Sequence, residues 1–411
     1  MPRSQHHDIV VIGAGIAGTT IARELLNRGQ SVCIIDSAAG PATGCSNHDH
    51  AIAHPHVGRG SPRLLQLTRI AFLLAESRWG KRWHQHGIFQ PTKKGMIFDS
   101  QQTSDYLRSL GLDESLATPL SAQAAQDICS LEQSGVWLPR GASLSLSEVS
   151  ITQLQKHEQL NCIWNTRVIR LQKVEKGWRL FDQNDREIVS ANKLIVTAAM
   201  GSRDLMASCD VRLPLRPVRG QLSIFSISPN NAWVDRLPRV GISGDGYCLP
   251  ATLLPNGTHQ WIVGSSFDEG ENDLDPRESS NEFNRAQAKG LLNYLDGDAR
   301  SLETEGSFVG IRCVAGDRLP IIGALVQRPG IFLATAFGSR GILWSALAAK
   351  LISAQVLEDD FALLTRLGLT SDLLTALSPT RFFAGALTAP AALGALASNS
   401  KPIFPSDPKA R

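Results

Sequence analysis

The chain has 411 residues, 43% of them hydrophobic and 19% charged, which is enough for two domains with buried cores. The net charge of +3 is too small to indicate a nucleic-acid-binding protein by itself. Seven scattered cysteines form no Cys-x-x-Cys pair, and no apolar run approaches the ~20 residues that span a bilayer. Composition therefore excludes a disulfide framework and a membrane-spanning protein, and it predicts a globular protein of the reducing cytoplasm.

The first forty residues carry the pattern of a βαβ unit. A buried-strand pattern over 7–12 leads directly into Gly-x-Gly-x-x-Gly at 13–18, and helical spacing follows over 19–28. A second apolar run over 31–35 ends on Asp36. Strand, glycine turn, helix and an acid about twenty residues further on together predict a dinucleotide-binding fold.

Each residue of this fingerprint has a physical task. Gly13 permits the tight turn, Gly15 lets the backbone approach a pyrophosphate, and Gly18 lets the helix pack closely on the strand. The free N–H groups at the helix N-terminus face the phosphates. Asp36 is expected to accept hydrogen bonds from ribose hydroxyls.

The middle of the chain is expected to leave this nucleotide-binding layer. A Gly-, Ser-, His- and Pro-rich loop covers 41–62, helical spacing follows over 63–87, and polar helical spacing covers 104–132. A short strand is expected at Gly95–Phe98. The later strands show alternating or buried patterns and are expected at 162–181, 193–199, 218–226, 245–250 and 259–267.

The last third returns to the nucleotide layer. A helix is expected at about 278–296, and Gly330–Ala336 reads as another buried strand. The turn Phe337–Gly341 then opens a long apolar helix over 342–357. A nucleotide fold interrupted by a β-rich insertion is typical of FAD oxidoreductases rather than of NAD dehydrogenases.

The sequence therefore predicts an α/β protein with a Rossmann-type FAD-binding domain interleaved with a β-rich substrate domain. We expect 1–95, 140–210 and 305–385 to form the FAD-binding domain, and 96–139 and 211–304 to form the substrate domain. The Ala-, Pro- and Ser-rich segment 386–411 is expected to be a mobile tail.

Late motifs give this pattern a specific resemblance. Gly310-Ile311-Arg312, the following 317–323 stretch Asp-Arg-Leu-Pro-Ile-Ile-Gly and the glycine turn at 337–341 resemble the D-amino-acid oxidase superfamily. Further stretches are similar, in order, to the FAD-dependent half of the bifunctional tRNA 5-methylaminomethyl-2-thiouridine biosynthesis (MnmC) family. These stretches are 213–221, 245–250, 263–267, 310–313, 337–341 and 377–382.

That resemblance implies a reaction. The family oxidises the C–N bond of a carboxymethylaminomethyl group on the wobble uridine of tRNA, and hydrolysis of the imine releases glyoxylate. Dioxygen is the expected electron acceptor. The bifunctional members also carry a methyltransferase half, which this chain lacks, so we expect methylation to require a separate protein.

The resemblance also implies the residues of the substrate site. Arg312 is expected to bind the substrate carboxylate through its planar guanidinium, with Arg340 as a second candidate. Tyr247 is expected to line the pocket and to hydrogen-bond the carboxylate or cap the site. A structural salt bridge or a core position is the alternative for each. Hydride transfer from a neutral amine needs no obligatory base, so no catalytic acid is assigned.

The remaining cofactor contacts follow from the fingerprint and the resemblance. Ser46 is expected to donate from its hydroxyl, and Val168 to contact the adenine side through its backbone. Gly338, Ser339 and Gly341 are expected to flank the isoalloxazine ring. The N-terminus of the helix that follows would stabilise the negative charge of the reduced ring.

The loop at 44–55 departs from the family pattern. Asp49 stands where the family has arginine, and His54 where it has tyrosine. Four histidines at 48, 50, 54 and 56 match no standard zinc spacing, so we expect a hydrogen-bonding loop and no metal. Two other functions stay open: a small-molecule oxidase of glycine, sarcosine or a D-amino acid, and a non-catalytic flavin-binding protein.

Overall fold

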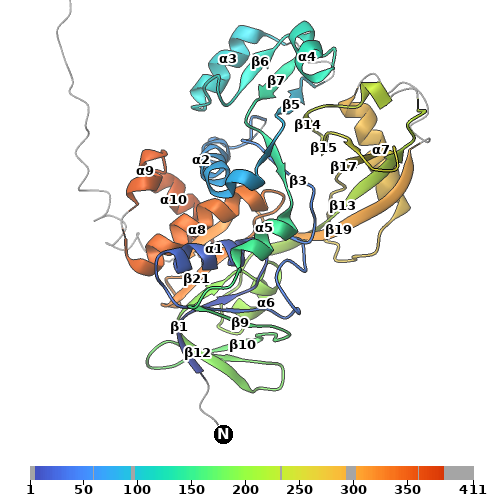
Figure 1. Ribbon diagram of the computed structural model, residues 1–411. Helices are drawn as coiled ribbons and strands as arrows, with labels where there is room; N and C mark the ends of the chain where they lie inside the picture. The colour runs from blue at the N-terminus through green and yellow to red at the C-terminus, as the bar shows by residue number, and fades with distance from the viewer. Residues whose placement is uncertain are drawn as a thin grey trace, which may run out of the picture.

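The computed structural model describes residues 5–58, 60–93, 98–231, 234–292, 302–359 and 361–383. Two large sheets with helices packed against them make up the fold (Figure 1). Within these ranges no helix is both long and apolar enough to cross a membrane, and all seven cysteines are free thiols. The expected tail at 386–411 and most of the strand expected at Gly95–Phe98 lie outside the described residues.

The first sheet has eight strands. They are β1 (Gln5–Ile12), β2 (Val32–Ile35), β9 (Leu160–Ile163), β10 (Arg170–Lys173), β11 (Trp178–Phe181), β12 (Glu187–Val196), β20 (Ile321–Ala324) and β21 (Ile331–Thr335). Strands β9, β2, β1, β12 and β21 pair in parallel in that spatial order. The hairpin β10–β11 and strand β20 add antiparallel edges.

Helices cover one face of this parallel core. Helix α1 (Ile16–Asn27) packs against α8 (Gly341–Leu357), and α8 packs against α2 (Pro62–Trp79). The opposite face is also covered, by a hydrophobic cluster that includes residues of α6. Strands β2 and β21 are therefore buried along their whole length. The other helices around this sheet are α5 (Leu146–Gln153), α6 (Gly201–Ala207), α9 (Ala362–Arg366) and α10 (Ser371–Leu377).

The second sheet has ten strands. They are β5 (Ile88–Pro91), β6 (Thr118–Leu120), β7 (Gly135–Leu138), β13 (Leu215–Ile227), β14 (Gly241–Gly244), β15 (Gly246–Cys248), β16 (Thr252–Leu253), β17 (His259–Gly264), β18 (Asp268–Glu269) and β19 (Glu303–Ala315). Helix α7 (Glu278–Leu291) packs on β13, β15 and β17. A small third sheet contains β3 (Ala51–Ala53), β4 (His84–Gln85) and β8 (Ala142–Leu144).

Two long strands connect the sheets. β13 and β19 each have 13 residues and pair antiparallel along most of their length. They run from the edge of the first sheet into the second, as Figure 1 shows. This arrangement of the two sheets confirms the expected α/β fold, in which a parallel sheet with a glycine turn is interleaved with a β-rich part.

Some sequence-based bounds were wrong. The polar helix expected over 104–132 is two helices, α3 (Ser100–Ser109) and α4 (Ala122–Cys129), separated by β6. Gly111, at φ +71°, takes the chain out of α3 in a conformation that favours glycine. Strand β5 pairs within the second sheet, and the expected domain bounds stay a prediction.

Helix α2 ends earlier than its spacing suggested. It begins with Pro62 after the N-cap Ser61, whose Oγ accepts from the Leu64 N–H at 3.2 Å. Gly80, at φ +49°, ends it, so the expected helix over 63–87 stops at Trp79. Helix α1 begins directly after Gly15, three residues before the start that its spacing suggested.

Candidate active site

A cavity of about 780 Å³ lies where the carboxyl ends of β12 and β21 meet β13 and β19. The N-terminal turns of both α1 and α8 line it. Each of these turns presents backbone N–H groups that have no partner within the helix, and the helix dipole makes each end electropositive. The cavity therefore favours negatively charged groups at two separate points.

The glycine fingerprint builds the first of these points. Gly13 has φ +107°, and a Cβ at Gly18 would lie 1.9 Å from the Gly13 carbonyl oxygen. No other residue fits at either position, so α1 packs directly against the end of β1. Gly15 lines the cavity, and Ser46 Oγ accepts from the Ile16 N–H at 3.0 Å.

Asp36 and Val168 lie behind this turn. The carboxylate of Asp36 accepts from the Ala14 N–H at 2.6 Å and from the Ala38 N–H at 2.9 Å, so it is held against the glycine turn. Val168 lies in the connection between β9 and β10. It packs on the face of the first sheet that lies opposite to α1 and α8. Neither residue lines the cavity, whereas Ser46 does. Their expected contacts with a dinucleotide remain predictions.

The turn before α8 builds the second point. Gly338 has φ +56°, and its N–H donates to the Cys313 carbonyl at 2.9 Å, which ties the turn to β19. Arg340 occupies the N-cap position of α8, and no side chain caps this end. Gly338, Ser339 and Gly341 all line the cavity, and their expected contact with a flavin ring stays a prediction.

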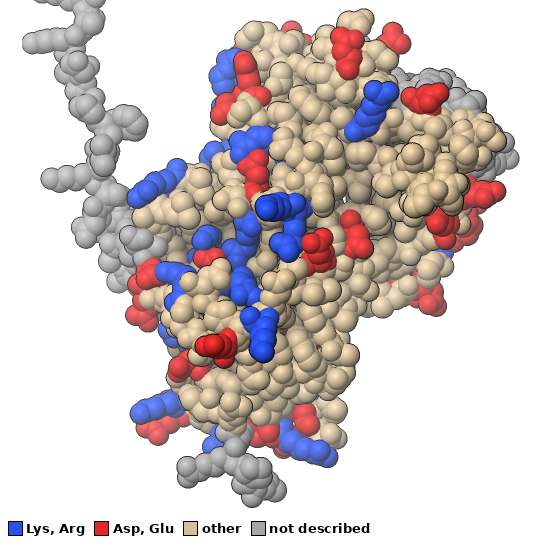
Figure 2. All heavy atoms as spheres, viewed as in Figure 1, with Lys and Arg blue, Asp and Glu red and all other residues tan. Residues whose placement is uncertain are grey.

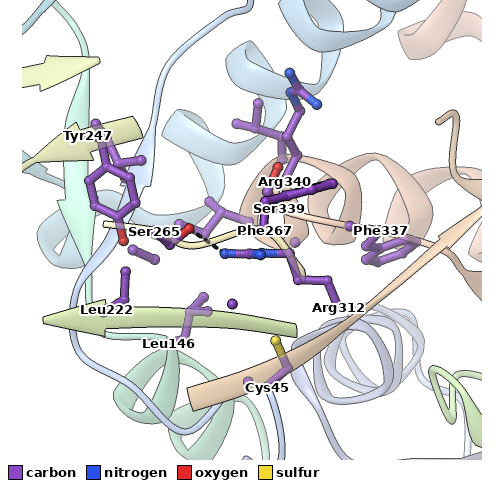
Figure 3. Close-up of a pocket in the computed structure, with 18 of the residues that line it drawn as sticks. Cys45, Leu146, Leu222, Tyr247, Ser265, Phe267, Arg312, Phe337, Ser339 and Arg340 are labelled. Carbon is purple, nitrogen blue, oxygen red and sulfur yellow. Dashed lines mark hydrogen bonds between the residues drawn. The ribbon is translucent and has the colours of Figure 1, made fainter. Parts of the chain in front are cut away.

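Arg312 occupies the wall between these two points. Its guanidinium lies across Gly220 of β13, donates to the Ser266 carbonyl at 3.2 Å and hydrogen-bonds Ser265 Oγ (Figure 3). It also lies 5.6 Å from the centre of the Phe267 ring. Burial lowers the pKa of Arg312. Within the described part of the chain, no carboxylate forms an ion pair with this guanidinium, so it can receive one from a ligand.

Tyr247 shares this part of the cavity with Arg312. Its hydroxyl donates to the His50 carbonyl at 2.9 Å, and burial raises its pKa. Arg340 points the other way: Figure 3 shows its guanidinium directed away from Arg312, and Nη2 lies 3.4 Å from His56 Nδ1. The structure thus brings Arg312 and Tyr247 together and leaves Arg340 apart.

Sequence reasoning missed two residues that hold Arg312. Ser265 was only part of a matched stretch, and its hydroxyl now accepts from the guanidinium. Gly220 was not singled out, yet a Cβ there would lie 2.2 Å from Arg312 Nη1. A glycine inside a long strand indicates close approach of another group, and that signal could have found it.

We expect the Gly220→Ala substitution to displace the Arg312 guanidinium. The added methyl group occupies the space of a flexible side-chain end, so we expect the fold to persist while carboxylate binding is lost. Apparent affinity for a carboxylate-bearing substrate should weaken about tenfold or more. Gly306→Ala, whose Cβ would meet only Ile224 at 3.8 Å, is the control on the same pair of strands. Equal affinities for the two variants would contradict this role of Gly220.

The histidine loop contributes neutral side chains to the cavity. Burial lowers the pKa of His48 to about 4 and that of His54 to about 4. His54 Nε2 lies 3.0 Å from Ser243 Oγ, and the His48 ring centre lies 4.7 Å from that of Phe308. Among the residues with described positions, no group of three or more His, Cys, Asp or Glu is arranged to hold a metal ion.

These two histidines predict an acid-sensitive fold. Above pH 6.5 both are neutral whether the chain is folded or unfolded. As the pH falls from 6.5 toward 4, the unfolded chain binds protons first, so stabilisation present above pH 6.5 is progressively lost. We expect the melting temperature to fall by roughly 5 °C between pH 7 and pH 5. The double variant His48→Asn, His54→Gln should show a shallower fall, and an unchanged slope would contradict the assignment.

Comparison with known proteins identifies the family. A family model described as FAD dependent oxidoreductase (DAO) matches residues 8–355. The chain belongs to this family of FAD-dependent oxidoreductases. It is an enzyme of the D-amino-acid oxidase type, and its cofactor is FAD.

Individual relatives support this assignment. The chain is 30% identical over 419 residues to the tRNA 5-methylaminomethyl-2-thiouridine biosynthesis bifunctional protein MnmC of Ralstonia nicotianae. That match covers 92% of this chain and 60% of the relative, so the chain spans about three fifths of the length of that protein.

Solved structures share the fold. Glycine oxidase from Geobacillus kaustophilus aligns with a TM-score of 0.72 at 20% identity, over 90% of this chain and 99% of the other. L-α-glycerophosphate oxidase from Mycoplasma pneumoniae, solved with FAD bound, aligns with a TM-score of 0.69 at 13% identity, over 86% and 95%. At these identities the likeness shows the fold alone.

The residues of the cavity fit FAD. The α1 N-terminus and the glycine turn offer N–H groups to a pyrophosphate, and a side chain at Gly15 would meet Ser46 Oγ at 3.3 Å. Asp36 lies at the end of β2, where an acid meets a ribose in this type of fold. Gly338 and Gly341 line the cavity beside the α8 N-terminus, whose free N–H groups suit an electron-rich ring.

Proposed function

We propose that this enzyme oxidises the C–N bond of the carboxymethylaminomethyl group on 5-carboxymethylaminomethyl-(2-thio)uridine at the tRNA wobble position, releasing glyoxylate. The observation that carries the proposal is Arg312, a buried guanidinium without an acidic partner in the described chain, at a cavity that fits FAD. The curated relatives named for tRNA modification support the choice of substrate.

Arg312 would bind the substrate carboxylate with its guanidinium, and Tyr247 would close the same side of the site. This fixes the methylene carbon next to the carboxylate, because a two-point contact leaves the carboxymethyl group little rotational freedom. FAD, when bound, would supply the acceptor for the hydride that leaves this carbon. Water then adds to the resulting imine, which breaks down to glyoxylate and the primary aminomethyl uridine.

The cavity supplies position and charge rather than a general base. Asp245 is the one carboxylate among the described lining residues, and it pairs with Lys93 at 2.7 Å. His48 and His54 are neutral at physiological pH because burial lowers the pKa of each to about 4. A neutral secondary amine needs no base for hydride transfer, so the proposed reaction does not require one from this cavity.

The proposal extends to the partners of the reaction. Dioxygen would take the electrons from the reduced cofactor and be reduced to peroxide. A methyltransferase would act on the aminomethyl product, and the tRNA substrate implies a cytoplasmic location.

A direct test is product analysis. The holoenzyme is incubated in air with tRNA that carries 5-carboxymethylaminomethyl uridine, and the tRNA is then digested to nucleosides. We expect loss of the carboxymethylaminomethyl nucleoside, an equal gain of the aminomethyl nucleoside, and one glyoxylate and one peroxide per turnover. Unchanged nucleosides under conditions in which the flavin does turn over with a small amine would reject the proposal.

A further inference from the structure

The rim of the cavity carries positive charge that substrate oxidation does not use. Four cations line the cavity, Lys93, Arg312, Arg318 and Arg340, against the single described acid Asp245. Lys93 is paired with that acid, and Arg312 is assigned to the substrate carboxylate. Arg318 and Arg340 are therefore the two lining cations that have neither role.

Arg318 is presented by a firmly held turn. It follows β19, its N–H donates to the Ala315 carbonyl at 3.0 Å, and it has φ +61°. The neighbouring Asp317 accepts from the Leu319 N–H at 3.1 Å and from Arg381 Nε at 2.7 Å. These contacts fix the backbone of the turn that carries Arg318.

The side chain of Arg318 is available to a ligand. It is 72% exposed, and the one acid near it is Glu269, at 3.9 Å from Nη2, which is beyond hydrogen-bond distance. Arg340 makes no ion pair with any carboxylate in the described ranges, and burial together with the nearby charge of Arg318 lowers its pKa. Arg318 and Arg340 line the same cavity, so their like charges repel, and an anion bound between them would relieve that repulsion.

Several basic side chains elsewhere on the molecule are paired with acids. Figure 2 shows Lys and Arg gathered over α1, α2 and α5, where acidic residues lie among them. Arg78 pairs with Glu24 at 2.7 Å, and Arg82 pairs with Glu148 at 3.0 Å. These two pairs are close, whereas Arg318 lies 3.9 Å from Glu269 and Arg340 has no ion pair with an acid in the described ranges.

We propose that Arg318 and Arg340, which line the same cavity, form a phosphate-binding clamp that holds the backbone of a polynucleotide whose modified base reaches Arg312. This rests on the proposed function. A nucleotide within tRNA carries one carboxylate on its base and phosphates on its backbone, which matches one inner and one outer cation site. Glycine or sarcosine carries a single carboxylate and leaves the outer site without a partner. The guanidinium fork suits phosphate oxygens.

The variant that tests the clamp is Arg318→Gln, and the chain provides a matched control. Arg216 on β13 also pairs loosely with Glu269, at 3.7 Å, and is 51% exposed, but it does not line the cavity. Arg216→Gln therefore removes the same charge and the same ion-pair partner away from the site. Steady-state oxidation is measured for modified tRNA and for the free modified nucleoside, between about 50 and 200 mM salt.

We expect Arg318→Gln to raise KM for tRNA about tenfold relative to Arg216→Gln, with kcat at saturating tRNA retained. The slope of log(kcat/KM) against log salt should fall by about 0.7, the value for one contact with a single-stranded phosphate. The increase in KM should be confined to tRNA, since the free nucleoside has no phosphate.

Three results would overturn the clamp. Identical constants for the two variants on tRNA would show that Arg318 contacts no phosphate. An equal KM increase on the free nucleoside would place the second anion in a small substrate. Failure of the unmodified enzyme to oxidise tRNA at all, while it oxidises small amines, would reject the proposed function and the clamp with it.

Discussion

Replacing Arg312 with glutamine should lower kcat/KM for flavin reduction by about 100- to 1,000-fold while the protein keeps its FAD. Loss of one partner of a buried charged pair costs about 3–4 kcal/mol, which corresponds to this factor. The guanidinium has no acidic partner in the described chain, so glutamine leaves no buried acid unpaired. Rapid mixing of the variant with substrate under anaerobic conditions gives the rate directly.

Two further variants test whether the loss of activity is specific to the Arg312 guanidinium. Arg312→Lys keeps the charge but loses the planar fork, and it should recover only part of the activity. Arg216→Gln removes an exposed charge from the neighbouring strand β13 and should behave as the unmodified enzyme. An Arg312→Gln enzyme with unaltered kcat/KM would show that another group binds the substrate.

Replacing Gly18 with alanine should abolish FAD binding. The added Cβ would lie 1.9 Å from the Gly13 carbonyl oxygen and 2.6 Å from Thr197 Oγ1, and neither the helix nor the strand can move without opening the glycine turn. We expect a colourless protein with a clearly lower melting temperature. Absorbance at the flavin bands and thermal unfolding measure both effects.

Gly40 gives the matched control for that substitution. It lies in the loop after β2, and a Cβ there would meet no atom within 4 Å. Gly40→Ala should therefore stay yellow and as stable as the unmodified protein. A yellow, fully stable Gly18→Ala protein would contradict the role assigned to the glycine turn.

The nucleotide-binding half could be predicted from the sequence because local signals determine it. Buried apolar runs at β1, β2, β12 and β21 appear where they were expected, and each is short, continuous and bounded by glycine or a polar residue. The expected helix over 342–357 is α8, which differs by one residue. The glycine fingerprint combines several local requirements, so it can be recognised without knowledge of the tertiary structure.

The second half was less predictable because long-range pairing determines it. The pairing of β13 with β19 joins residues about ninety positions apart, and no local pattern specifies that register. Gly111 and β6 divide a segment that reads as one polar helix, because tertiary pairing overrides a weak helical pattern.

The candidate site could likewise be predicted only in part from the sequence. Arg312, Tyr247 and the turn at 338–341 were predicted from the sequence, and all of them line the cavity. The sequence could not predict that Arg340 points away from Arg312, because its direction depends on how α8 packs beneath the histidine loop. The contact between Arg312 and Gly220 likewise exists only once β13 and β19 are paired.

The measurement that tests the central claim most directly is anaerobic reduction of the purified yellow enzyme. One cuvette receives tRNA carrying carboxymethylaminomethyl uridine, and another receives glycine or sarcosine at high concentration. We predict that the tRNA bleaches the flavin absorbance and releases glyoxylate, while the small amines leave it unchanged. Bleaching by the small amines alone would contradict the proposed function and assign the enzyme to the small-molecule amine oxidases.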